Sequence, residues 1–130
     1  MKFDKLFLDT LSSQAKSSSR LRVNYDLRNS EDDQSQRMLN ALHPGTILPI
    51  HRHPETSETI IVIRGSVCEK YFDEDNNITD QFFLKAGTDH VMLHIPAGTW
   101  HTLECMEPGT IIFEAKDGAY HPISKNDIKQ

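Results

Sequence analysis

Cysteine is scarce in this chain, which has only Cys68 and Cys105 among its 130 residues. The two residues form no CxxC motif or other metal-ligand spacing, so a thiolate metal site is not expected. We interpret both as small hydrophobic residues that stay reduced and lie buried in the core. A chain of this length can bury enough apolar surface to fold without cross-links.

Basic clusters and long apolar runs are also lacking. The chain has 14 Lys and Arg against 19 Asp and Glu, a net charge of -5, and its basic residues form no run. This balance argues against nucleic acid and anionic membranes as partners, because both bind surfaces that neutralise phosphates. No apolar stretch is long enough to span a bilayer. The N-terminus interleaves charged with apolar residues, unlike a signal peptide, so we expect a cytoplasmic protein.

Hydrophobic periodicity predicts one helix followed by a β domain. Apolar residues at helical spacing over residues 3–16 indicate a short amphipathic helix, which the following serines end. Beyond it, short runs rich in Ile, Val, Phe and Thr alternate with turn residues, which is typical of an all-β sandwich or barrel. We expect a single domain over residues 1–130: a helical segment at 1–19, a β-barrel at 20–121 and a tail at 122–130 that packs across the barrel or frays.

The polar stretch HRHPETSE contains residue types that commonly bind metal ions. His51 and His53 are two residues apart, so in an extended segment both imidazoles leave one face while Arg52 points the other way. Glu58 opens the next apolar run, and antiparallel pairing of the two segments would bring its carboxylate beside the imidazoles. Gly65 ends that run, which is consistent with a turn that needs a positive φ or close backbone approach.

His101 opens a later apolar run and is a fourth candidate ligand. Three imidazoles and one carboxylate suit a divalent transition metal such as Fe, Mn, Ni, Co or Zn, and leave coordination positions for water or substrate. Taken alone, the His51 and His53 pair also fits a solvated strand end with no ligand role. Glu58 and His101 favour the metal site, because all four residues fall at strand starts where they can converge.

These residues resemble the two sequence motifs of the cupin superfamily. Pro96, Gly98 and His101 fit the core of the second motif, although Gly87 lies further from Pro96 than usual and Cys105 stands where Asn is common. The first motif is matched without a gap by its two glycines and three candidate ligands: Gly45, His51, His53, Glu58 and Gly65. The resemblance implies a small double-stranded β-helix, or jelly-roll barrel, with one divalent metal per chain near its centre.

Residues 20–121 are also similar to the WbuC-type cupin-fold metalloproteins, small bacterial proteins often encoded with O-antigen or other surface-polysaccharide genes. That family's pattern of Glu followed by Gly-Pro-Tyr is matched by Glu114, Gly118 and Tyr120, with Ala119 in place of proline. The resemblance implies a metal site but no particular reaction.

Several functions remain open at this point. In the first hypothesis, an enzyme acts on a small molecule such as a sugar or sugar-nucleotide intermediate of surface polysaccharides. Glu114 would then be a general base or orient a ligand histidine, provided that its face of the strand looks inward. An Fe(II)-dependent dioxygenase is a variant of this hypothesis. The second hypothesis is a non-catalytic module that senses or sequesters a small molecule, and the third is a purely structural metal.

Three further residues, Arg20, Tyr25 and Tyr120, are candidates for the mouth of a substrate pocket. Small β-barrels present strand edges and flat sheet faces that need covering, so we also expect a homodimer. The N-terminal helix or the strand RLRVNYDL would form its interface.

Overall fold

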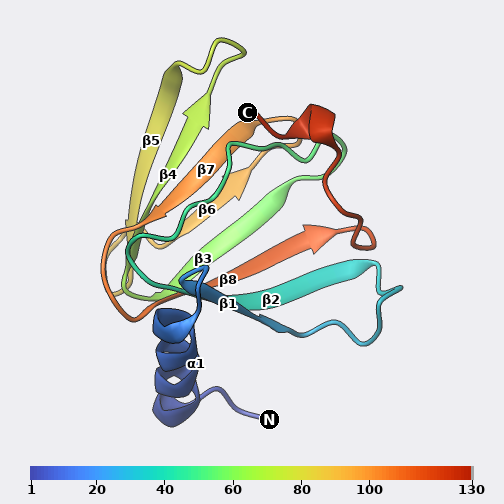
Figure 1. Cartoon of the computed structure of the whole chain (residues 1–130). Coiled ribbons are helices and arrows are strands. Elements are labelled where there is room, and N and C mark those ends of the chain that lie inside the picture. The colour runs from blue at the N-terminus through green and yellow to red at the C-terminus, as the bar shows by residue number, and fades with distance from the viewer. Residues whose placement is uncertain (130) are drawn as a thin grey trace.

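The computed structural model describes residues 1–129, which contain one α-helix, eight strands and one short 3-10 turn (Figure 1). Helix α1 (Lys5–Ser17) begins at Asp4, whose side chain accepts a hydrogen bond from the backbone N–H of Phe7 at 3.0 Å. It ends at Ser18, where the backbone becomes extended. The predicted helix over residues 3–16 and its end among the serines are therefore confirmed.

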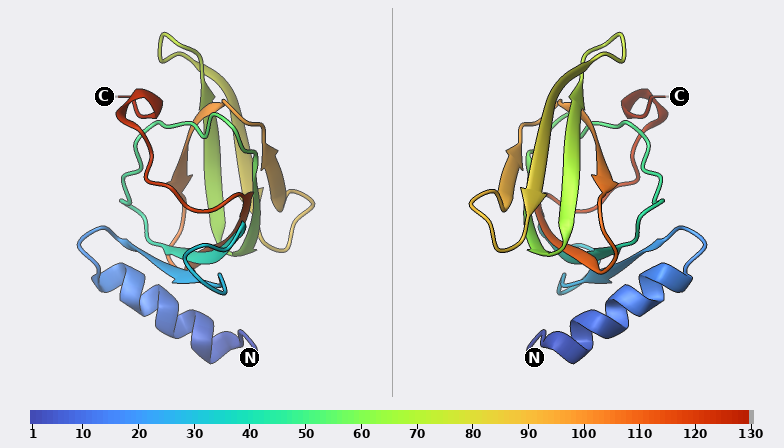
Figure 2. Two further views of the ribbon diagram at one scale, coloured as in Figure 1. Left: turned by 90° about the vertical axis from the view of Figure 1, so that its right-hand side faces the viewer. Right: turned by 90° about the vertical axis from the view of Figure 1, so that its left-hand side faces the viewer.

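Antiparallel strands make up the rest of the fold. They are β1 (Arg22–Asp26), β2 (Ser35–Leu42), β3 (Glu58–Arg64), β4 (Ser66–Phe72), β5 (Ile78–Lys85), β6 (Met92–Ile95), β7 (Trp100–Cys105) and β8 (Thr110–Asp117). One sheet has the order β1-β2-β8-β3-β6 and the other the order β5-β4-β7. The two sheets enclose a common interior (Figure 2), so the chain has the predicted all-β jelly-roll architecture with a short N-terminal helix.

Strand β2 shows how alternation separates two cores. Leu42 belongs to the cluster inside the barrel, and Asn40 lines the cavity there. Leu39 and Ala41 point to the opposite face, where they pack under helix α1. Because successive side chains of a strand leave opposite faces, this one strand supplies both the interior of the barrel and the bed of the helix.

Helix α1 lies against the outer face of β1, β2 and β8 (Figures 1 and 2). Its buried residues Leu8, Leu11 and Ala15 form the outer cluster together with side chains of these strands. The guanidinium of Arg64, at the end of β3, donates to Asp9 of the helix at 2.7 Å. The helix is thus attached to the outside of the barrel, away from the interior.

The C-terminal segment packs along the candidate ligand segment. Arg52 donates to Asp127 at 2.8 Å, and Ile128 forms an isolated bridge with His51. The backbone N–H of Lys129 donates to the carbonyl of Ile50 at 2.8 Å. Of the two behaviours considered for the tail, packing is therefore the one observed.

Gly65 and the two cysteines have the surroundings that the sequence predicts. Gly65 has a φ of 77°, and a Cβ there would lie 2.7 Å from the Cα of Thr110. This position therefore needs glycine for both reasons that the sequence suggested. Cys68 and Cys105 are buried and form no disulfide, as predicted.

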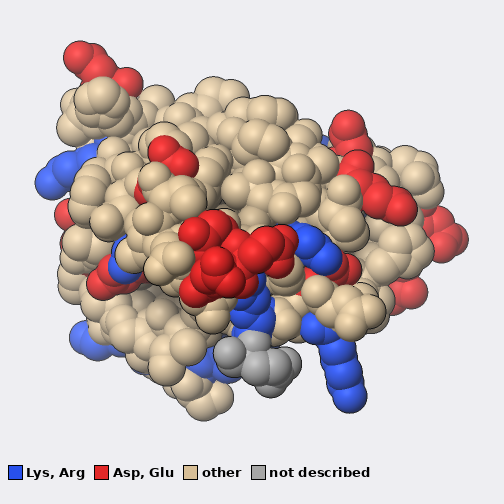
Figure 3. Space-filling view, turned by 90° about the horizontal axis from the view of Figure 1, so that it is seen from above, with Lys and Arg blue, Asp and Glu red and all other residues tan. Residues whose placement is uncertain are grey.

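Charged side chains are mixed on the face shown in Figure 3. Acidic side chains gather near its middle, and the Lys and Arg side chains are dispersed around them. This face therefore carries no continuous basic surface of the kind that binds phosphates. Within residues 1–129, the single helix is too short and too polar to cross a membrane.

Candidate metal centre

Three histidines converge at one end of the barrel interior. His51 and His53 lie on the irregular segment between β2 and β3, whereas His101 lies on β7 of the smaller sheet. Each offers one ring nitrogen, and these nitrogens all lie within 4.8 Å of one another. His101 is buried and the other two are half-buried. The structure thus brings together all three histidines singled out from the sequence.

The convergence does not arise through the pairing expected from the sequence. Glu58 and its strand β3 pair with β6 and β8, not with the segment that carries His51. His51 instead forms an isolated bridge with His101 on β7. The expected hairpin was wrong because both edges of β3 are already paired, one with β6 and the other with β8.

Backbone carbonyls fix the orientation of two imidazoles. The Nδ1 atom of His51 lies 2.9 Å from the carbonyl oxygen of Pro49, and Nδ1 of His101 lies 2.8 Å from that of Thr99. A carbonyl oxygen only accepts, so Nδ1 must carry the proton in both rings. Each Nε2 therefore has a free lone pair, which is the form in which histidine binds a metal.

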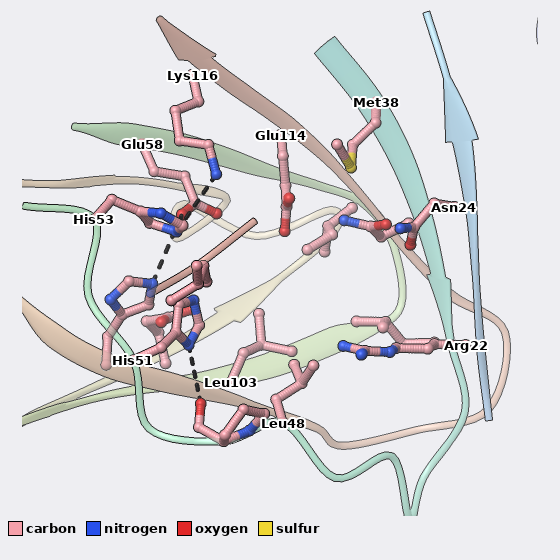
Figure 4. A pocket seen from close by; sticks show the side chains of 17 residues that line it. Arg22, Asn24, Met38, Leu48, His51, His53, Glu58, Leu103, Glu114 and Lys116 are labelled. Atoms are coloured by element: carbon pink, nitrogen blue, oxygen red, sulfur yellow. Dashed lines mark hydrogen bonds and ion pairs between the residues drawn. The ribbon is translucent and has the colours of Figure 1, made fainter. Parts of the chain in front are cut away.

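The carboxylate of Glu58 lies against the same nitrogens (Figure 4). Its Oε2 atom is 3.3 Å from Nε2 of His53 and 3.6 Å from Nε2 of His101. Glu58 is buried, and within residues 1–129 this oxygen has no hydrogen-bond partner. Buried carboxylate oxygens are nearly always hydrogen-bonded or bound to a cation. A divalent cation among these four side chains would provide the missing partner, so the residues present fit a transition metal.

The pKa values of His51 and Glu58 also favour binding of a metal ion. Burial, together with the charge of the neighbouring His101, lowers the pKa of His51 to about 4, so His51 is neutral at pH 7. Burial alone would raise the pKa of Glu58, but contacts with His101 and His53 hold that pKa well below its usual range. Metal binding needs neutral imidazoles and an ionised carboxylate, and His51 and Glu58 are in these two forms.

A cavity of about 240 Å³ opens beside the cluster and extends through the barrel interior (Figure 4). Apolar side chains, including Leu48 and Leu103, line part of it, and polar side chains of both sheets line the rest. Lys116 reaches toward the cluster, with its Nζ 3.4 Å from Nε2 of His53. The candidate metal centre thus faces a space that can hold a small molecule.

Glu114 points into this cavity from β8 (Figure 4). Its face of the strand therefore looks inward, which was the condition set for a role in the site. Burial raises the pKa of Glu114 to about 8, and the nearby charge of Glu58 raises it as well. A group with this pKa exchanges protons near neutral pH.

A second acid, Glu69 on β4, also lines the cavity. It is 1% exposed, and burial raises its pKa well above the usual range. Sequence reasoning missed it because the buried stretch Val67, Cys68 and Glu69 lacks simple alternation. A carboxyl group within an apolar strand was the only signal that could have drawn attention to this position.

The expected pocket-mouth residues lie elsewhere. Tyr25 is on the outer face of β1, where its ring packs against Phe7 of helix α1 at 5.0 Å between centroids. Arg20 precedes the strand and is exposed, and Tyr120 is 56% exposed with Arg28 over its ring. None of these three lines the cavity, so this part of the prediction was wrong.

The face of strand β1 opposite Tyr25 lines the cavity instead. Arg22 and Asn24 line the cavity, whereas Val23 and Tyr25 pack under the helix. A one-residue change of position on a strand moves a side chain to the opposite face. The sequence of β1 alternates Arg22 and Asn24 with the apolar Val23 and Tyr25, so it separates the two faces. Only the tertiary structure shows that the apolar face packs under the helix and the polar face lines the cavity.

Comparison with known proteins agrees with this architecture. The family model described as "Domain of unknown function (DUF6016)" matches residues 3–84. A germin-like protein from Morus alba is 38% identical over 60 residues, which cover 46% of this chain and 27% of that protein. The matched segment includes part of the barrel rather than the whole fold.

Solved structures show the same fold at low sequence identity. The capsular polysaccharide assembling protein CapF from Staphylococcus aureus has a TM-score of 0.68 at 16% identity, covering 86% of this chain and 32% of that one. An oxalate oxidase in complex with glycolate has a TM-score of 0.64 at 17% identity, covering 84% of this chain and 57% of that one. The chain thus spans less than two thirds of each of these proteins. These neighbours show the fold, and membership of the cupin superfamily stays a prediction from the motifs.

Proposed function

Since this chain belongs to the family described as domain of unknown function DUF6016, we propose its function from the site itself: it is a metal-binding cupin that binds or acts on a small molecule. In this proposal His51, His53, Glu58 and His101 hold one divalent transition metal. The observation that carries the proposal is the buried Oε2 atom of Glu58, which lies among imidazole nitrogens without a hydrogen-bond partner in residues 1–129.

A ligand-binding centre fits better than a purely structural metal. A structural site is closed by its protein ligands, whereas a catalytic or ligand-binding site keeps positions open. The cavity of about 240 Å³ reaches His51, His53 and His101 directly. A small molecule in this cavity would therefore reach any metal held by these residues.

A sugar or a sugar-nucleotide intermediate of surface polysaccharides is the ligand class that we propose. One supporting observation is the likeness in fold to CapF, which is described as a capsular polysaccharide assembling protein. The similarity of residues 20–121 to WbuC-type proteins points to the same class. Membership of that subfamily stays a prediction.

Two acids beyond the proposed ligands favour an enzyme over a non-catalytic binding module. A bound divalent metal would polarise a carbonyl or hydroxyl group, or activate water or dioxygen. Glu114 faces the cavity with its pKa raised to about 8 by burial, so it can hold a proton at neutral pH and release it to a ligand atom. Glu69 offers a second carboxyl group on the opposite sheet. A binding module would need neither acid.

The metal site is tested by elemental analysis of protein purified without a metal-binding tag. We expect about one divalent metal ion per chain in the wild type and a loss of metal in the His51→Ala, His53→Ala double variant. The matched control is the His90→Ala, His121→Ala double variant, because both of these histidines are exposed and lie outside the cavity. Equal metal content in both double variants would contradict the proposal. The same measurement identifies the metal, and only iron would be consistent with an Fe(II)-dependent dioxygenase.

Homodimerisation is part of the same proposal. Within residues 1–129, strand β1 has one neighbour in its sheet, so its other edge is open to pairing with a second copy. Light scattering at micromolar concentration measures the mass directly. A monomer under these conditions would show that the barrel does not need a second copy.

A further inference from the structure

Arg22 differs from four other arginines in having no acidic partner within residues 1–129. It is half-buried on β1, lines the cavity, and within residues 1–129 makes no hydrogen bond or ion pair through its guanidinium. Four other arginines are each paired with a carboxylate: Arg28 with Asp26, Arg37 with Asp33, Arg52 with Asp127 and Arg64 with Asp9. A half-buried guanidinium without a counter-charge is poorly compensated, so a ligand is the natural source of its partner.

The position of Arg22 sets the direction in which a ligand would lie. In Figure 4 the guanidinium enters the cavity from the side opposite His51 and His53. Leu48 and Leu103 lie along the cavity between these two ends. A molecule in the cavity therefore has the histidine cluster at one end and a positive charge at the other.

Two buried oxygen atoms on the cavity wall also lack partners. They are Oδ1 of Asn40, a residue that is 8% exposed, and Oε1 of Glu69, which is 1% exposed. Within residues 1–129 neither atom has a hydrogen-bond partner, and both residues line the cavity. Buried polar atoms are nearly always hydrogen-bonded, so these two indicate ligand hydroxyl groups, which can donate to the amide oxygen of Asn40 and can either donate to or accept from the carboxyl group of Glu69.

The size of the cavity limits the ligand. Pockets that enclose drug-sized molecules measure roughly 300 to 1,000 Å³. This cavity has a volume of about 240 Å³. It can enclose one molecule of monosaccharide size, whereas the nucleotide part of a sugar nucleotide would have to remain outside.

We propose that the cavity binds a small hydroxylated acid of monosaccharide size, with its anionic group on Arg22 and its hydroxyl groups on Asn40 and Glu69. This inference rests on the proposed function, because the other end of the acid lies at the candidate metal centre. Carboxylate and phosphate groups share the required chemistry, since both accept two parallel hydrogen bonds from a guanidinium. The anionic group, rather than the sugar ring alone, is then the main determinant of specificity.

Isothermal titration with three probes tests this inference. D-glucuronate carries a carboxylate, D-glucose 6-phosphate carries a phosphate, and D-glucose is neutral. We expect at least one anionic probe to bind wild-type protein at least about 10-fold more tightly than glucose, because hydrogen bonds between charged groups are the stronger ones. The tighter of the two anionic probes identifies the anionic group. If neither binds more tightly than glucose, the inference is wrong.

Variants at Arg22 assign the effect to this residue. We expect Arg22→Gln to weaken binding of the anionic probe about 10- to 100-fold, and Arg22→Lys to weaken it less, since lysine keeps the charge but loses the planar fork. Arg20→Gln is the matched control, because Arg20 is exposed and lies outside the cavity. Equal affinities for Arg22→Gln and Arg20→Gln, in protein that melts at the wild-type temperature, would overturn the inference.

Metal content measured on the same samples separates this inference from the proposed function. Loss of anion binding in Arg22→Gln at unchanged metal content supports both the anion site and the metal centre. Binding that depends on Arg22 in a wild-type protein free of metal would support the anion site and contradict the metal centre. A metal-loaded protein that binds all three probes equally would support the metal centre and contradict the anion site.

Discussion

His51 and His101 are joined through their backbones by two reciprocal hydrogen bonds, of 3.0 Å from His51 N–H and 2.9 Å from His101 N–H. These bonds link two segments that are 50 positions apart in the sequence. Because the two backbones are held together, the fold itself places the two imidazoles side by side, with 4.3 Å between their ring centroids. The metal-free chain is therefore expected to have its ligands in place, and metal affinity then depends mainly on ligand chemistry.

Glu58→Gln tests the contribution of the carboxylate to that chemistry. The amide keeps the shape of the side chain but removes the charge that a divalent cation would neutralise, so we expect metal affinity to fall at least about 10-fold. A chelator competition titration measures the change. Glu104→Gln is the control, because Glu104 is an exposed carboxylate on β7. Equal affinities of the two variants would exclude Glu58 as a ligand.

Glu114→Gln is expected to change the pH dependence of stability in metal-free protein. Burial raises the pKa of Glu114 from 4.5 to about 8, so the folded state keeps a proton that the unfolded state releases. Wild-type stability gained from this group is complete below pH 4.5 and is lost as the pH rises toward 8. The glutamine stays neutral, so the melting temperature of the variant should rise relative to wild type between pH 5 and pH 8. A difference that is constant over this range would contradict the assignment.

Gly65→Ala is expected to destabilise the barrel far more than the same change at Gly87. Both residues have a φ of 77°, but a Cβ at Gly65 would lie 2.7 Å from Cα of Thr110, whereas none of the described atoms comes within 4 Å at Gly87. The strained φ costs both variants about 1 to 3 kcal/mol. We expect the additional overlap to cost Gly65→Ala at least about 1 kcal/mol more. Urea denaturation of both proteins measures the difference, and equal midpoints would show that the turn can shift.

Leu11→Ala tests whether helix α1 stabilises the barrel without taking part in the site. Leu11 is 4% exposed in the outer cluster, so we expect a loss of about 2 to 5 kcal/mol in the free energy of unfolding. Metal content should stay at the wild-type level, because the helix lies outside the barrel. Leu6→Ala is the matched control on the same helix, since Leu6 is 74% exposed and should change stability by no more than about 0.5 kcal/mol. A loss of metal in Leu11→Ala at a temperature where the protein is folded would contradict this prediction, because it would show that the outer cluster affects the metal centre.

The sequence by itself determined the local features of this protein. Helical spacing predicted α1, short β-rich runs predicted most of the strands, and the requirement for glycine at position 65 followed from the end of an apolar run. The motif spacing also selected His51, His53 and His101, which do converge. These features depend on neighbouring residues or on short spacings, and such information is present in the chain before it folds.

Only the tertiary structure decided which side chains share the cavity. Arg22 faces the interior and Tyr25 the helix because β1 pairs with β2 in one register, and a shift of one residue would exchange the two faces. Glu69 reaches the cavity because β4 is placed between β5 and β7 in the second sheet. Pairing between strands far apart in sequence sets these positions, and no local pattern records that pairing.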